Sequence, residues 1–185
     1  MQFLLDLWLP IVLSAVVVFF ASFAAWTLLP HHREDIRPLP DEGPIVSALA
    51  TLRLPPGMYA WPMPAKPADY KTKEFADRSA RGPWGSLNVQ PAAPSMGRSL
   101  VLVFLFYLVV GVFVAYVTSQ SVVPGAEYLR VFQIAGTVAI VAYCFGQIPG
   151  AIFFGKSLRF TLTDLLDGVV YGLLTAGIFS WLWPR

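Results

Sequence analysis

Four long apolar stretches, three of them without Asp, Glu, Lys, Arg or His, constrain this chain more than any other feature. The first three cover residues 8–29, 99–121 and 131–155. About 20 apolar residues suffice for a helix to cross roughly 30 Å of hydrocarbon. A fourth stretch, residues 162–183, has the same apolar character but carries Asp164 and Asp167 near its start. The sequence therefore predicts four transmembrane helices.

The composition agrees with an all-α membrane protein. Charged residues make up 13% of the chain and hydrophobic residues 56%, whereas soluble domains carry about 25% charged residues. Residues 1–7 contain Asp6 and lack the Lys or Arg that begins a signal peptide. We therefore expect the first span to be retained as a signal anchor.

The distribution of basic residues predicts an orientation. Eleven of the 13 Lys and Arg residues lie between the first and second spans or between the third and fourth. Cytoplasmic loops of membrane proteins are enriched in Lys and Arg. We expect a bacterial inner-membrane protein with both termini in the periplasm and a cytoplasmic loop subdomain at residues 30–98.

Proline and glycine divide this loop into short elements. Asp41 and Pro44 favour the start of a short amphipathic helix that ends before Pro55. Residues 72–80 predict a second helix, and residues 58–61 and 84–89 read as extended segments that can pair across it. The loop has nine basic and seven acidic residues. This balance argues against nucleic-acid binding.

Small residues mark a helix-packing face on the fourth span. Gly168, Gly172, Ala176 and Ser180 recur every four residues. Helices in lipid associate through such faces because small side chains allow close backbone approach. The third span carries a looser set, which we expect to be its partner: Ala139, Ala142, Gly146 and Gly150.

Asp164 and Asp167 are candidates for a polar site, because carboxylates inside a membrane span are costly. Both lie at the start of their span, however, where a helix dipole favours an anion. We expect a first-turn position capped by Thr161 or Thr163, or a salt bridge to Lys156 or Arg159. The alternative is a proton or ion relay.

His31 and His32 follow the first span and precede Glu34 and Asp35. Imidazole nitrogens can bind a metal ion or a haem. Neighbouring residues on a helix point about 100° apart, however, so they do not converge on one ion. The pattern favours an interfacial role over a metal site, and we expect no cofactor. Cys144, the single cysteine, fits a buried, inert thiol.

Five short runs resemble signatures of a family of uncharacterised bacterial inner-membrane proteins. They are residues 29–33 (LPHHR), 39–42 (LPDE), 55–59 (PPGMY), 95–100 (SMGRSL) and 171–177 (YGLLTAG). The resemblance covers nearly the whole chain. It implies a membrane location but no activity, ligand or catalytic residue.

The sequence favours an accessory or assembly subunit of a larger membrane complex, of respiratory or photosynthetic type by analogy. We expect it to bind lipids and other membrane subunits, and not to be an enzyme, since it lacks the common catalytic and nucleotide-binding motifs. One alternative is a transporter component that uses Asp164, Asp167 and Gln147. Another is a lipid-acting enzyme with His31 or His32 as base.

Overall fold

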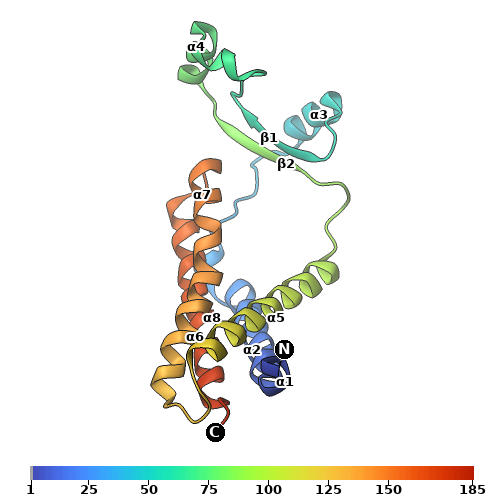
Figure 1. Ribbon diagram of the computed structural model, residues 1–185. Coiled ribbons are helices and arrows are strands. Elements are labelled where there is room, and N and C mark those ends of the chain that lie inside the picture. The colour runs from blue at the N-terminus through green and yellow to red at the C-terminus, as the bar shows by residue number, and fades with distance from the viewer. Residues whose placement is uncertain (1) are drawn as a thin grey trace. The chain divides into compact units, whose positions relative to one another are not determined.

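The computed structural model describes residues 2–185, which fold into two compact units (Figure 1). The membrane unit combines the residues up to Arg37 with Ser95–Arg185, and the loop unit is Pro38–Pro94. The loop unit is thus shorter than the predicted 30–98. The polypeptide that directly follows the first span belongs to the membrane unit, because its side chains bond to the last helix.

In the described residues of the membrane unit, every regular element is a helix or a helical turn. Four helical segments are long and apolar enough to cross a membrane, as predicted. Its elements are α1 (Gln2–Asp6), α2 (Trp8–Thr27), η1 (Pro30–His32), α5 (Met96–Ser121), α6 (Tyr128–Cys144), η3 (Phe145–Gln147), α7 (Ile148–Phe154) and α8 (Leu158–Trp181).

Three of the spans begin earlier than predicted, and serines cap two of them, α5 and α8. The Ser95 hydroxyl accepts a hydrogen bond from the amide of Arg98, and the Ser157 hydroxyl accepts one from Phe160. Such caps satisfy amides that have no partner within the helix. The predicted capping role of Thr161 or Thr163 is therefore wrong, and Asp164 lies beyond the first turn of α8.

The third span is interrupted near its end. Helix α6 stops at Cys144, the 3₁₀ turn η3 follows, and α7 resumes with Pro149 as its second residue. Proline has no amide hydrogen and its ring crowds the carbonyl four positions earlier. That position is Phe145, the first residue of the turn, so the proline accounts for the break.

Helices α6 and α8 lie side by side with close backbone approach (Figure 1). A Cβ atom added to Gly172 would lie 2.5 Å from Ile140 Cγ1 and 3.1 Å from the Ile140 amide nitrogen. One added to Gly168 would lie 2.7 Å from Cys144 Sγ. Glycine is therefore required at both positions for this packing.

The remaining residues of the predicted packing faces divide into two groups. Ala139, Ala176 and Ser180 are buried in the membrane unit. Gly146 is exposed, and a Cβ there would meet nothing within 4 Å. Ala142 is exposed as well, and a Cβ added to Gly150 would meet nothing within 4 Å. These predictions are wrong because α8 meets a different face of α6, the one that carries Ile140, Tyr143 and Cys144.

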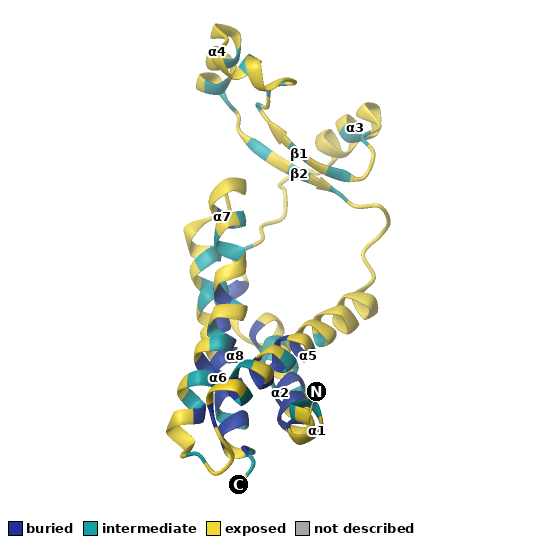
Figure 2. Ribbon diagram, viewed as in Figure 1, coloured by how far each residue is buried: buried dark blue, intermediate teal, exposed yellow. Residues whose placement is uncertain are grey.

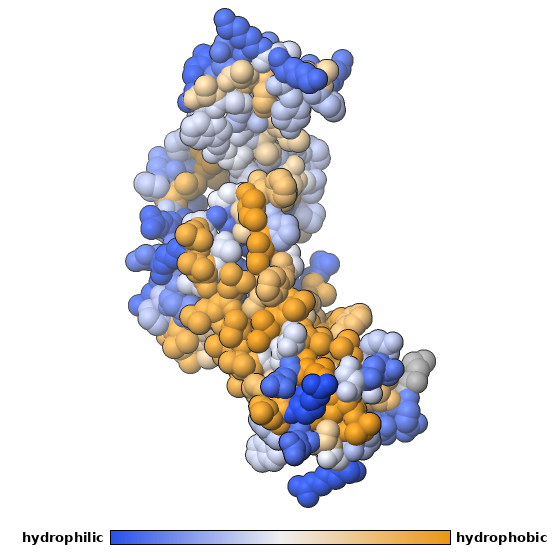
Figure 3. Space-filling model, turned by 60° about the vertical axis from the view of Figure 1, so that its left-hand side comes forward, coloured by the Kyte–Doolittle hydropathy of each residue, from blue (hydrophilic) through white to orange (hydrophobic). Residues whose placement is uncertain are grey.

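Helix α2 packs against α5 and α8 and completes the bundle. It approaches α5 closely at Gly111, where an added Cβ would lie 3.2 Å from the Ile11 carbonyl oxygen. Buried side chains line the contacts between the helices (Figure 2), and apolar side chains gather on the outer surface (Figure 3). Both sets suit a bundle that is surrounded by lipid.

The loop unit contains the elements that the sequence predicts. Helices α3 (Gly43–Leu52) and α4 (Lys73–Arg81) flank strands β1 (Gly57–Trp61) and β2 (Gly85–Val89). The strands pair antiparallel, with Gly57 opposite Val89 and Trp61 opposite Gly85. Asp41 accepts a hydrogen bond from the Gly43 amide at the start of α3, and Thr72 caps α4.

The loop unit has no hydrophobic core of its own. Every residue of Pro38–Pro94 is described, and each is exposed or only partly buried (Figure 2). Its sheet has two strands, and an isolated two-stranded hairpin is at best marginally stable in water.

Candidate histidine–aspartate site

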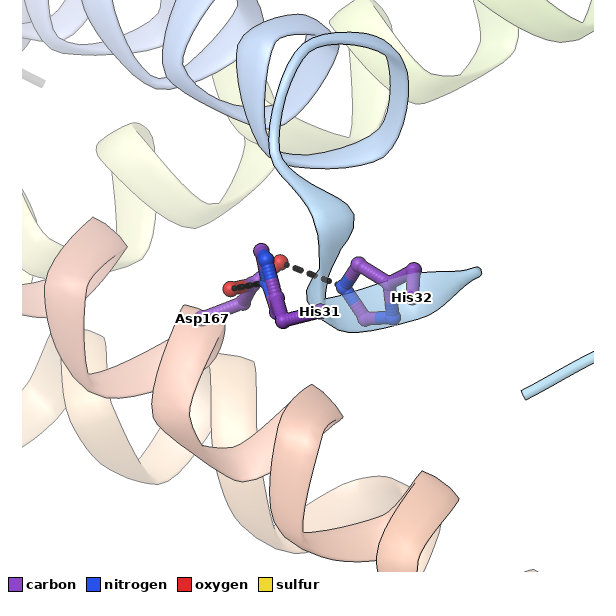
Figure 4. A group of neighbouring side chains, drawn as sticks. All are labelled: His31, His32 and Asp167. Atoms are coloured by element: carbon purple, nitrogen blue, oxygen red, sulfur yellow. Dashed lines mark hydrogen bonds and ion pairs between the residues drawn. The ribbon is translucent and has the colours of Figure 1, made fainter. Parts of the chain in front are cut away.

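The end of α2 places two histidines against α8. Helix α2 ends at Thr27, and Pro30 begins the 3₁₀ turn η1, whose second and third residues are His31 and His32. Proline suits the first position of a helical turn because that position needs no amide donor. Figure 4 shows both rings directed towards Asp167 on α8.

Asp167 contacts both histidines through different oxygens. His31 Nε2 lies 2.9 Å from Asp167 Oδ1, and His32 Nε2 lies 2.9 Å from Asp167 Oδ2. The Tyr171 hydroxyl, one turn further along α8, donates a 3.0 Å hydrogen bond to Asp167 Oδ2. The carboxylate is thus held by three side chains from two elements.

The other nitrogen of His32 faces a second carboxylate. His32 Nδ1 lies 2.7 Å from Asp35 Oδ2, which also accepts a 2.8 Å hydrogen bond from the Thr163 hydroxyl. Trp26 stacks on the His32 ring with the centroids 4.0 Å apart and the planes 5° from parallel. His32 is therefore fixed both in position and in orientation.

Arg159 lies on α8, and its exposed side chain bonds to the turn η1 and to the residues that follow it. Its guanidinium donates to Glu34 Oε2 at 2.7 Å and to the His31 carbonyl oxygen at 3.0 Å. The same group lies 4.0 Å from Asp35 Oδ1. That buried oxygen accepts no hydrogen bond from the described residues.

The surroundings shift the pKa values of two groups: His32, which belongs to η1, and Asp35, which follows it. Burial by itself would lower the pKa of His32, but hydrogen bonds to Asp167 and Asp35, together with their negative charges, raise it above its ordinary value. Burial would raise the pKa of Asp35. Hydrogen bonds from Thr163 and His32, and the charges of His32 and Arg159, instead lower it.

These positions differ from the sequence expectation. His32 is buried, and the two histidines converge on one carboxylate. The expectation that neighbouring residues point apart fails for two reasons. A 3₁₀ turn brings the centroids of the two histidine rings to 4.3 Å from each other, and Asp167 reaches them from another helix. The sequence places Glu34 and Asp35 beside the histidines, but no sequence pattern indicates the contacts of Tyr171, Trp26 and Thr163 with the cluster.

Asp164 lies outside this cluster. Its Oδ2 atom is 3.8 Å from Lys156 Nζ, one of the two salt bridges that the sequence suggests. Asp164, Asp167 and Gln147 line one cavity of about 610 Å³ among α2, α5, α6 and α8. Aromatic side chains, among them Phe106 and Tyr107, form much of its wall. The cavity thus brings together the three residues of the transporter alternative.

The cluster has two chemical capacities. Its imidazoles and carboxylates can hold protons between them, and the same atoms can bind a cation, because one nitrogen from each histidine and an Asp167 oxygen lie within 4.8 Å of one another. Both capacities depend on the contact between η1 and α8.

Comparison with known proteins adds no assignment. No family model, no curated protein and no solved structure matches the chain. The resemblance to uncharacterised bacterial inner-membrane proteins therefore stays a prediction.

Proposed function

We propose that this chain is an accessory or assembly subunit of a bacterial inner-membrane complex and that its loop unit binds a partner protein. The proposal rests on one observation: none of the residues in Pro38–Pro94 is buried. A folded segment must bury apolar surface to offset its conformational entropy. A partner surface can supply the burial that the loop unit lacks.

The exposed side chains of the loop unit are those that protein interfaces favour. Large apolar residues stand in solvent around the hairpin: Met58, Trp61, Met63, Tyr70 and Trp84. Aromatic residues and methionine are enriched in the buried centre of interfaces. Because Trp61 pairs with Gly85, the two tryptophans lie at the same end of the sheet.

The charge of the loop unit favours a protein over a lipid surface. Pro38–Pro94 contains six basic and five acidic side chains, a net charge of +1. Attraction to anionic lipid requires a cluster of Lys and Arg, each of which contributes about 1 kcal/mol near the surface. The mixed charges here provide no such cluster.

The positive-inside rule supports a cytoplasmic location for the loop unit. The loop unit and the turn before α8 carry most of the basic residues, so this side of the bundle is proposed to face the cytoplasm. Both termini lie at the opposite end: Gln2, Val122 and Trp183 line one pocket there. The proposed topology therefore has both termini in the periplasm.

Photocrosslinking in intact membranes tests the proposal. A photoreactive residue at Met63, which is 62% exposed in the loop unit, should give one discrete adduct with a partner chain. The same residue at Val109, 52% exposed on α5, is the control for contacts with lipid and passing proteins. Trp84→Ala should reduce the Met63 adduct. A discrete monomer after mild detergent extraction, with no Met63-specific adduct, contradicts the proposal.

A further inference from the structure

We propose that His31, His32 and Asp167 form a binding site for one divalent transition-metal ion, such as Zn²⁺ or Co²⁺. Two imidazole nitrogens and one carboxylate oxygen are ligands that these ions accept. The site goes beyond the proposed function, because a subunit that binds a partner through its loop unit does not need a metal at the end of α2.

The donor atoms have nearly the separation that an ion needs. Bonds of about 2.0 Å in a tetrahedral arrangement place the ligand atoms about 3.3 Å apart. In the structure each histidine Nε2 lies 2.9 Å from a different Asp167 oxygen, and one donor atom from each of the three residues lies within 4.8 Å of the others. Side-chain rotations that shorten the longest of these separations by up to about 1.5 Å would admit the ion.

Asp35 holds His32 in the orientation that a ligand requires. A metal-binding histidine donates its second ring N–H to a carboxylate, a carbonyl or water, which fixes the tautomer and aims the free nitrogen at the ion. His32 Nδ1 lies 2.7 Å from Asp35 Oδ2, and Nε2 faces Asp167. This is the carboxylate–histidine–metal arrangement with the ion's position between His32 and Asp167.

Asp167 is oriented in the same way. The Tyr171 hydroxyl donates to Asp167 Oδ2, and the Trp26 ring stacks on His32 from the other side. These contacts hold two of the three ligands before any ion arrives, which lowers the cost of ordering them on binding.

An ion at this position would link two distant parts of the chain. His31 and His32 follow α2, and Asp167 lies 135 positions after His32 on α8. Three protein ligands leave one tetrahedral position for water or another molecule. The ion takes the place of the hydrogen atoms between the two Nε2 atoms and Asp167. A protonated ring releases that proton to solvent, whereas a neutral ring keeps its single hydrogen on Nδ1.

A metal titration of the full chain tests the site directly. The protein is purified in mild detergent with an affinity tag that contains no histidine, treated with chelator, desalted and titrated with Co²⁺ or Zn²⁺. We expect one equivalent of Co²⁺, detected by its visible absorption. His31 and His32 are the two histidines of the chain, so imidazole NMR signals should both shift with one equivalent of Zn²⁺.

Variants on one helix provide matched controls. Asp167→Asn should weaken Co²⁺ binding by more than tenfold, whereas Asp164→Asn should leave it unchanged, because Asp164 pairs with Lys156. Tyr171→Phe removes a hydrogen bond to Asp167 and should weaken binding by about 10–100-fold, the usual effect of losing an orienting partner.

Three outcomes would overturn the proposal. The first is no saturable binding by the wild-type chain up to about 1 mM ion. The second is binding that leaves both imidazole signals in place, which would mean that the ion sits elsewhere. The third is equal affinity in folded Asp167→Asn and Asp164→Asn. The imidazole measurement needs no variant, so it decides the question even if Asp167→Asn does not fold.

Discussion

His32 and Asp167 are 135 positions apart in the sequence, yet His32 Nε2 lies 2.9 Å from Asp167 Oδ2. The contact joins the turn after the first span to the last span. It determines that the polypeptide following α2 belongs to the membrane unit. It also explains how an aspartate can be accommodated in a membrane span, since buried ionisable groups there pair with one another.

Removal of the Asp167 carboxylate should destabilise the metal-free protein far more than removal of Asp164. Breaking a buried ion pair costs about 3–5 kcal/mol because the partner charge stays buried. Asp164 pairs with a Lys156 side chain that is 44% exposed, and such pairs are worth about 0–1 kcal/mol. Thermal unfolding of Asp167→Asn and Asp164→Asn in chelator checks this difference. Similar losses in both would contradict it.

Gly172→Leu should lower the thermal stability of the detergent-solubilised protein. The side chain would be placed where Ile140 Cγ1 and backbone already lie within 2.5–3.2 Å of the new Cβ. Overpacking of this kind typically costs about 1–3 kcal/mol. Val109→Leu, on an exposed face of α5, is the control and should have no effect. Equal, negligible effects would show that α6 and α8 do not pack here.

Gly168 and Gly146 should respond differently to the same small change. An alanine at Gly168 would bring its Cβ to 2.7 Å from Cys144 Sγ, whereas one at Gly146 would meet nothing within 4 Å. We expect Gly168→Ala to lower the unfolding temperature and Gly146→Ala to leave it unchanged. A lower unfolding temperature for Gly146→Ala would support the packing role that the sequence predicts for Gly146.

Reporter fusions should reveal both termini on one side of the membrane. The arrangement of Lys and Arg predicts that a reporter inserted near Lys71 is cytoplasmic and one fused after Arg185 is periplasmic. Alkaline phosphatase and green fluorescent protein fusions distinguish the two sides. The opposite pattern would place the loop unit and the histidines outside the cytoplasm.

The loop unit should not fold cooperatively by itself. A fragment of residues 38–94 contains no buried side chain and therefore lacks the core that offsets chain entropy. We expect rapid amide hydrogen exchange at β1 and β2 in the fragment and slower exchange in the native membrane complex. Slow exchange in the isolated fragment would remove the main support for a partner.

Local patterns in the sequence were sufficient to locate most elements. Span length and apolar content predict the four membrane helices, and Asp41 with the surrounding prolines and glycines predicts the elements of the loop unit. The four-residue spacing of Gly168 and Gly172 predicts a face for close packing. Each of these depends on neighbours within one or two helical turns, so no knowledge of the fold was needed.

The site depended on the tertiary structure. His31 and His32 would point apart on a regular helix. The 3₁₀ turn at Pro30 and the packing of α8 against it bring both rings to Asp167. The outward position of Gly146 likewise follows from the packing, because α8 contacts the face of α6 that carries Ile140 and Cys144. Sequence periodicity determines which residues share a helix face. The residue that each face meets depends on how distant helices pack, and that is set by the whole bundle.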